Sequence, residues 1–147
     1  MEHMRTIDPF DLARFRMAQS PLFPTVLAEL HAGRKRTHWM WFIFPQLRGL
    51  GRSSTARLYA ISSLQEAQAY LQDPVLGDRL KLATAATLAL SGSSANAIFG
   101  SPDDLKFHSS MTLFSIASGD AGSSFHSALD QYFSGQLDPQ TLDLLRR

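Results

Sequence analysis

The chain has 147 residues, of which 44% are hydrophobic and 18% charged, with no cysteine and a formal net charge of +1. This size and composition are typical of one globular domain rather than of a disordered or fibrous chain. Without cysteine there is no disulfide, thiolate zinc site or cysteine nucleophile. The longest apolar run covers only residues 39–44, whereas roughly 20 apolar residues are needed to cross a membrane. We therefore expect one domain over 1–147, with an ordered core at about 8–145, no membrane segment and a cytoplasmic location.

Five dipeptides place a helix-capping side chain directly before a proline. They are Asp8-Pro9, Ser20-Pro21, Asp73-Pro74, Ser101-Pro102 and Asp138-Pro139. The serine or aspartate oxygen can accept a hydrogen bond from a free amide at a helix start, and proline in the first turn loses no hydrogen bond. Five such start signals predict a mainly helical protein, although the second allows at most a break or kink within a longer helix.

Apolar residues at helical spacing place the helices along the chain. The expected segments are 9–33, interrupted near 20 and ended by Gly33, followed by 63–72, 74–92, 102–114, 123–135 and 138–147. Ser63 and Glu66 form a capping-box match at the start of 63–72. Two short stretches, 39–44 and 57–61, could be strands that pair with each other, although 39–44 could equally be a helix. We therefore predict a compact, mainly α domain of about six to eight helices with at most two short strands.

Positive charge is concentrated in one part of the chain. No acidic residue lies between Glu29 and Glu66. Six basic residues lie there: Arg34, Lys35, Arg36, Arg48, Arg52 and Arg57. Such a local excess indicates an anionic partner.

Both tryptophans, Trp39 and Trp41, lie in this basic stretch, and two roles for them stay open. Each indole can bury on the order of 200 Å², so the pair can simply fill the core. Alternatively, one indole stacks on a flat ligand while guanidinium groups pair with its phosphate or carboxylate. Gln46 could then hydrogen-bond a base or amide edge.

The turn at 49–54, GLGRSS, follows the tryptophans. It can expose several backbone amides at once, which is how anion-binding nests form. It lacks the Gly-Lys-Ser/Thr of a Walker loop and the third glycine of a dinucleotide fingerprint. A flexible turn with a serine N-cap is the alternative, while the adjacent Arg48, Arg52 and Arg57 favour an anion site.

A second polar cluster is SPDDLKFHSSMTLF, residues 101–114. On a helix, Asp104 and His108 have the spacing at which a carboxylate can hold an imidazole in one tautomer. Ser109 points about 100° away from His108, so a triad on this one helix would be poorly aimed. Alternatively, Asp103 and Asp104 simply favour the helix dipole. No metal site or cofactor is predicted, because the five histidines lack ligand spacing: His3, His31, His38, His108 and His126.

Three stretches carry a likeness to a known family: AELHAGRKRTHWMWFIFPQLRGLGRSS, YAISSLQEAQAYLQDPVLGDRL and IFGSPDDLKFHSSMTLF. From about Phe10 to Leu145 the chain resembles the bacterial family of domain of unknown function 1810, some of whose members carry a calpastatin label. The resemblance implies a small, mostly α-helical single domain and brings no established activity. It also implies a variable residue at position 108, which favours His38, Asp103, Asp104 and Lys106 over His108.

Two functional hypotheses follow. The first is a pocket that binds, and could hydrolyse, a small phosphorylated or nucleotide-like anion, with His38, Asp103 and Asp104 as acid–base candidates. Its candidate ligand-binding residues are Arg34, Lys35, Trp39, Trp41, Gln46, Arg48, Arg52 and Lys106. The second is a non-catalytic module that binds nucleic acid or an acidic protein through its basic face. A homodimer face on the aromatic stretch is a third possibility. The pocket hypothesis requires segment 38–48 to fold next to the acidic turn near 103.

Overall fold

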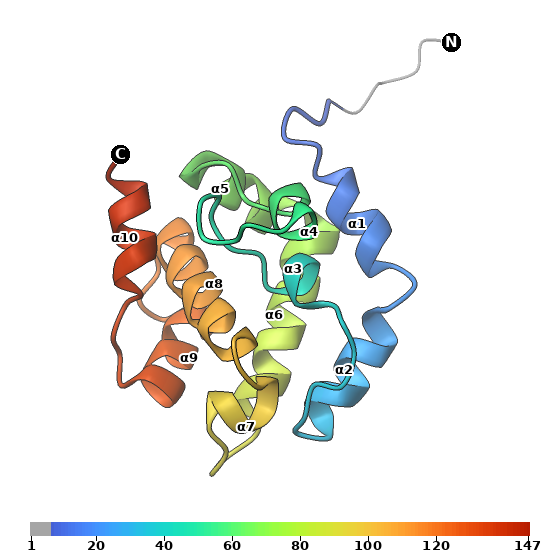
Figure 1. Ribbon diagram of the computed structural model, residues 1–147, viewed down its shortest axis with the longest axis vertical. Coiled ribbons are helices and arrows are strands. Elements are labelled where there is room, and N and C mark those ends of the chain that lie inside the picture. The colour runs from blue at the N-terminus through green and yellow to red at the C-terminus, as the bar shows by residue number, and fades with distance from the viewer. Residues whose placement is uncertain (1–6) are drawn as a thin grey trace.

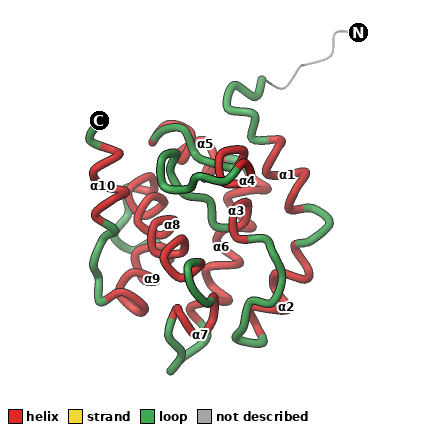
Figure 2. The backbone as a smooth tube through the Cα atoms, in the orientation of Figure 1, coloured by secondary structure: helices red, strands yellow, loops and turns green. Residues whose placement is uncertain are grey.

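The computed structural model describes residues 7–147, so residues 1–6 of the expected domain, His3 among them, lie outside the described part. The helices in 7–147 pack into one body (Figure 1), and loops alone connect them (Figure 2). They are α1 (Ala13–Gln19), α2 (Phe23–His31), α3 (Met40–Ile43), α4 (Ser54–Leu58), α5 (Leu64–Gln72), α6 (Pro74–Leu88), α7 (Ala95–Phe99), α8 (Asp103–Ser118), α9 (Ser124–Phe133) and α10 (Pro139–Leu145).

The mainly α prediction is confirmed, with ten helices in the described chain rather than six to eight. The additional helices include α3, α4 and α7, which have only four or five residues each. A helix of little more than one turn is too short to show an apolar periodicity, so the sequence did not indicate these three helices. None of the helices in residues 7–147 is long and apolar enough to cross a membrane.

Three of the five predicted capping signals act at helix starts. Asp73 caps α6 and Asp138 caps α10, each by accepting hydrogen bonds from amides of the first turn. Asp8 does the same just ahead of α1. Ser20 and Ser101 do not cap a helix, because Ser20 ends α1 and Pro102 itself occupies the position before α8.

Neither of the two stretches that could have been strands is a strand in the described residues. Most of the stretch 39–44 is helix α3. A short apolar run can be buried equally well as a helix or as a strand, so the sequence did not distinguish the two. What remains of strand pairing is one isolated parallel bridge between Leu47 and Ile61. The amide of Arg48 donates to the Ile61 carbonyl at 2.8 Å, and this bond fixes the chain on both sides of α4.

The core lies around the two longest helices, α6 and α8. Helix α6 packs mainly against α2, α5 and α9, and helix α8 packs mainly against α5, α7 and α9. Phe107 of α8 stacks on Phe99 of α7 and contacts Phe44 edge-on, with ring centroids 4.6 and 5.0 Å apart. Phe44 directly follows α3, so this aromatic cluster holds the tryptophan segment against α8.

Candidate functional site

The two tryptophans have different environments. Trp39 is buried, with 1% of its surface exposed, and its indole Nε1–H donates to the Glu29 carboxylate at 2.9 Å. Trp41 is half-buried, and the ammonium nitrogen of Lys106 lies 5.1 Å from its ring centroid. Trp39 is therefore part of the core, whereas part of the Trp41 side chain is accessible to solvent.

Glu29 holds the segment that leads into α3. Its carboxylate also accepts hydrogen bonds from the amides of Arg36 and Thr37 and from the Thr37 hydroxyl. Burial raises the pKa of Glu29, but the hydrogen bonds from Arg36, Thr37 and Trp39 outweigh that effect and hold the pKa at about 2. Glu29 is therefore ionised at neutral pH and fixes the course of residues 36–39.

The tryptophan segment and the acidic turn come together at Asp103. One carboxylate oxygen of Asp103 lies 2.8 Å from the ammonium group of Lys35, and the other lies 3.3 Å from that of Lys106. Lys35 is almost buried, and its ammonium nitrogen lies 5.2 Å from the Trp39 ring centroid. The contact of Lys35, Asp103 and Lys106, called here the lysine clasp, therefore ties the chain ahead of α3 to the start of α8.

The lysine clasp leaves little room for a ligand. Trp41, Gln46 and Lys106 do line one hollow, together with Met40, Phe44, Ala56 and Tyr59, but its volume is only about 10 Å³. That is room for about one water molecule. Of the predicted residues, Lys35, Asp103 and Lys106 therefore meet here, and their charges are paired with one another.

Among residues 7–147, no hydrogen bond or ion pair links His38 to Asp103 or Asp104. His38 is exposed, and among residues 7–147 its ring has no hydrogen-bond partner. Asp104 accepts hydrogen bonds from the side chain of Asn96 at 3.3 Å and from the Leu105 amide. Asp103 is engaged in the lysine clasp.

His108 and Ser109 also have structural contacts. The His108 ring stacks on Phe133 at 4.0 Å between centroids, and its Nε2 lies 2.8 Å from the Gln136 carbonyl oxygen. The Ser109 hydroxyl donates to the Asp138 carboxylate at 2.8 Å, on the approach to α10. His108 does not form the pair with Asp104 that the spacing allowed. Within the described residues, no three metal-ligating side chains gather at one point.

The basic residues of the acid-free stretch separate into two groups. Arg34 and Arg36 are exposed on the loop after α2, next to α7, where the Lys35 amide bonds to the Ile98 carbonyl. Arg48, Arg52 and Arg57 are exposed around α4. Figure 1 shows α7 and the end of α2 at the opposite end of the molecule from α4. The stretch therefore forms no single basic patch.

Arg48 and Arg57 line an open hollow of about 390 Å³, called here the arginine hollow. Its walls come from the approach to α1, from α4 and from the start of α5. The other lining residues are Pro9, Phe10, Asp11, Arg14, Leu58, Ser62 and Glu66.

Arg14 also lines the arginine hollow, but its hydrogen-bond donors are already used. A guanidinium has five N–H donors. All five are used, by the carbonyl oxygens of Phe10, Asp11, Leu58 and Ala60 and by the Glu66 carboxylate. Glu66 is buried, and its second oxygen accepts from the amide and hydroxyl of Ser62. The Arg14–Glu66 pair is therefore neutral and has no donor left for a ligand.

Arg48 and Arg57 differ from Arg14 in this respect. Within residues 7–147, neither guanidinium has a carboxylate oxygen within 4 Å or a side-chain hydrogen bond. Asp11 is the remaining acid of the hollow, and it is exposed. The lining thus carries two available guanidinium groups against one exposed carboxylate.

The turn at 49–54 forms the serine N-cap that was one of its two predicted alternatives. Ser53 caps α4 by accepting from the Ala56 amide at 3.0 Å. Gly51 lies so close to Ala56 that an added Cβ would be 2.5 Å from the Ala56 methyl carbon, which explains glycine there. Arg52 on this turn is exposed and does not line the arginine hollow.

Sequence reasoning missed Arg14 and Glu66 and did not separate Arg57 from the other basic residues. Arg14 meets Glu66 from 52 positions away, so no local pattern links them. The Ser63–Glu66 capping match was a partial signal. Ser63 does cap α5, but the Glu66 carboxylate turns to Arg14 and Ser62 instead of closing the box.

The fold places the chain among compact all-helical single domains. The family model described as "Protein of unknown function (DUF1810)" matches residues 9–145, and the chain belongs to this family. This confirms the resemblance that the sequence carries.

A solved structure extends the comparison over nearly the whole chain. The chain resembles the conserved hypothetical protein Rv1873 from Mycobacterium tuberculosis, with 54% sequence identity and a TM-score of 0.92. The match covers 95% of this chain and 99% of that one. A comparison with curated proteins finds no match. Neither matching description names an activity.

Proposed function

We propose that the arginine hollow binds a small anion that carries a phosphate group. The observation that supports this is the pair of guanidinium groups, Arg48 and Arg57, that lack a carboxylate partner in the described chain and line one hollow. Guanidinium groups pair with phosphate oxygens through two parallel hydrogen bonds, which a lone ammonium group cannot match. The volume of about 390 Å³ lies in the range of small-molecule sites.

The other lining residues suit the non-phosphate part of such a ligand. Phe10 and Leu58 give the hollow an apolar edge, and the Leu58 side chain is 56% exposed. An aromatic or sugar ring placed there would cover surface that water now meets. Arg14 acts as a positioning residue, because its hydrogen bonds tie α1 to the end of α4 and so set the width of the hollow.

The proposal is binding and not hydrolysis. His38, Asp103 and Asp104 do not line the arginine hollow, and both oxygens of the Glu66 carboxylate already accept hydrogen bonds from Arg14 and Ser62. Of the ligand-binding candidates, Arg48 alone lies in the hollow. A ligand role for Arg34, Lys35, Trp39, Trp41, Gln46, Arg52 and Lys106 stays a prediction, as does a cytoplasmic location.

The test is calorimetric titration with pyrophosphate and with adenosine monophosphate. We expect the double variant Arg48→Gln/Arg57→Gln to weaken binding by about a hundredfold, roughly tenfold for each charge-assisted contact. The matched control is Arg34→Gln/Arg36→Gln, which removes two exposed arginines of the same stretch at the other end of the molecule. Binding that the first variant leaves unchanged, or that both variants reduce equally, contradicts the proposal.

A second candidate function is an interaction module for nucleic acid or an acidic protein. The observation in its favour is that Arg34, Arg36, Arg48, Arg52 and Arg57 are all exposed. Such binding weakens steeply with salt, because counterions are released from the polyanion. Capture of a single-stranded oligonucleotide that weakens in both arginine double variants and falls steeply between 50 and 200 mM salt would favour this function.

A further inference from the structure

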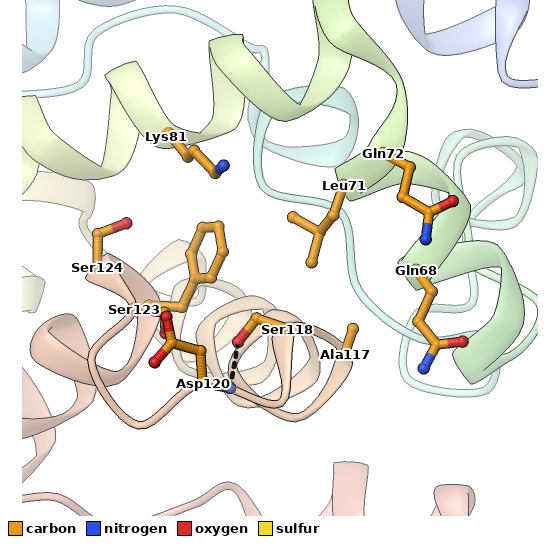
Figure 3. Close-up of a pocket in the computed structure, with 10 residues that line it drawn as sticks. Gln68, Leu71, Gln72, Lys81, Ala117, Ser118, Asp120, Ser123 and Ser124 are labelled. Atoms are coloured by element: carbon orange, nitrogen blue, oxygen red, sulfur yellow. Dashed lines mark hydrogen bonds between the residues drawn. The ribbon is translucent and has the colours of Figure 1, made fainter.

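A second hollow lies away from the arginine hollow, between α5, α6 and the turn that joins α8 to α9 (Figure 3). Its volume of about 460 Å³ is also in the range of small-molecule sites. None of its lining residues belongs to the lysine clasp or to the arginine hollow.

Two opposite charges line this hollow without meeting. Lys81 reaches in from α6, and Asp120 lies across from it on the turn (Figure 3). Within residues 7–147, neither takes part in an ion pair at 4 Å or less. Both side chains belong to exposed residues, so each charge is open to a ligand.

The position of Asp120 is set by its own turn. Its Oδ1 accepts the Gly122 amide at 2.8 Å, and its backbone amide donates to the Ser118 hydroxyl at 3.2 Å. The Oδ2 atom accepts no hydrogen bond from a described residue. The turn therefore holds one carboxylate oxygen in place and leaves the other for a ligand donor.

Amide groups and apolar side chains complete the lining. Gln68 and Gln72 lie one turn apart on α5 beside Leu71 (Figure 3). Both glutamine side chains are exposed, and neither makes a hydrogen bond within the described chain. Leu71 supplies apolar surface, whereas Phe125, which also lines the hollow, is a core residue with only 2% of its surface exposed.

We propose that this hollow binds a short peptide with free ends, of about dipeptide size. The peptide carboxylate would pair with Lys81, the ammonium group with Asp120, and the peptide amide with Gln68 or Gln72. A side chain of the peptide would rest on Leu71. A phosphate-bearing anion fits less well, because the Asp120 carboxylate would repel it.

The test is a titration of the labelled protein with alanyl-leucine, followed by nuclear magnetic resonance of backbone and glutamine amides. We expect saturable shifts at residues 68–72 and 118–125, up to about 10 mM ligand, which would detect a Kd near 1 mM. N-acetyl-alanyl-leucine amide, which lacks both charges, should bind at least about tenfold more weakly.

Variants sharpen the assignment. Lys81→Gln and Asp120→Asn should each weaken alanyl-leucine binding about tenfold. Asp78→Asn is the matched control, because Asp78 is an exposed acid on α6 that does not line the hollow and should not change binding. No shifts at these residues, equal binding of the blocked peptide, or unchanged binding in both hollow variants would overturn the proposal. None of these outcomes depends on phosphate binding at the arginine hollow.

Discussion

The lysine clasp and the arginine hollow both contain basic side chains, but the basic groups of the clasp are paired with a carboxylate, whereas two of those in the hollow are not. At the clasp, both carboxylate oxygens of Asp103 contact a lysine, and about 10 Å³ remains empty beside Trp41. In the arginine hollow, Arg48 and Arg57 have no carboxylate partner among residues 7–147, and about 390 Å³ is open.

The difference shows how to separate structural charges from charges that are available to a ligand. The clasp joins parts of the chain that are nearly 70 positions apart, so its charges stabilise the fold. Arg14 belongs to the same class, although it lines the arginine hollow, because all of its donors are used. Only a donor without an internal partner can contribute its full hydrogen-bonding capacity to a ligand.

The largest expected effect is on stability, from Glu29→Ala near the clasp. The change removes the acceptor for the buried Trp39 indole and for the amides of Arg36 and Thr37. Since buried donors without partners are costly, we expect the free energy of unfolding to fall by about 3 kcal/mol, measured by urea denaturation. Glu29→Gln keeps an acceptor oxygen and should lose less. An alanine variant as stable as wild type would show that water replaces the carboxylate.

The next effect is a pH dependence of the same contact. The pKa of Glu29 is lowered from 4.5 to about 2 in the folded protein. The contribution of its charge to stability is therefore fully present above pH 4.5 and is lost as pH falls towards 2. We expect this loss to reach about 3 kcal/mol at most, and to be absent from Glu29→Gln. Identical slopes for the two proteins between pH 4.5 and 2, in urea denaturation at each pH, would contradict the assignment.

A smaller loss is expected for Asp103→Asn. Asparagine leaves the nearly buried Lys35 ammonium without a counter-charge. We expect the free energy of unfolding to fall by about 2 kcal/mol, measured by thermal or urea denaturation. Pyrophosphate affinity should stay unchanged, because Asp103 does not line the arginine hollow. Unchanged stability together with altered pyrophosphate binding would reverse the roles given to the two regions.

The smallest effect on stability is expected for Arg48→Gln/Arg57→Gln. Both residues are exposed and have no ion pair in the described chain, so the Tm should stay within about 2 °C of wild type. Pyrophosphate binding should nevertheless weaken by about a hundredfold. A large drop in Tm, measured by differential scanning calorimetry, would place these arginines in the same structural class as Arg14.

The long helices could be predicted because their signals are local. Asp73 and Asp138 cap helices where the sequence places them, and apolar spacing marks α5, α6, α8 and α9. Ser20 has the same local pattern yet ends a helix, because the chain turns there. The conformation of residues 39–44 is decided by burial against α1 and α6, which a single apolar run does not specify.

The candidate site could be predicted only in part, for a similar reason. The meeting of the tryptophan segment with residue 103 was expected, and Lys35, Trp41 and Lys106 do gather there. That the charges cancel there could not be foreseen, because it depends on distances of a few ångströms. Arg14 carried no signal at all, since its partners at 58, 60 and 66 are brought to it by the packing of α1.

The amino-acid sequence by itself determined the helical class, the main helix starts and the excess of positive charge between Glu29 and Glu66. These are properties of neighbouring residues, which hydrogen bonding and spacing along the chain decide. The tertiary structure alone decided which of those charges are neutralised and which stay open. Neutralisation requires an opposite charge within about 4 Å, and residues far apart in the chain reach that distance only through packing.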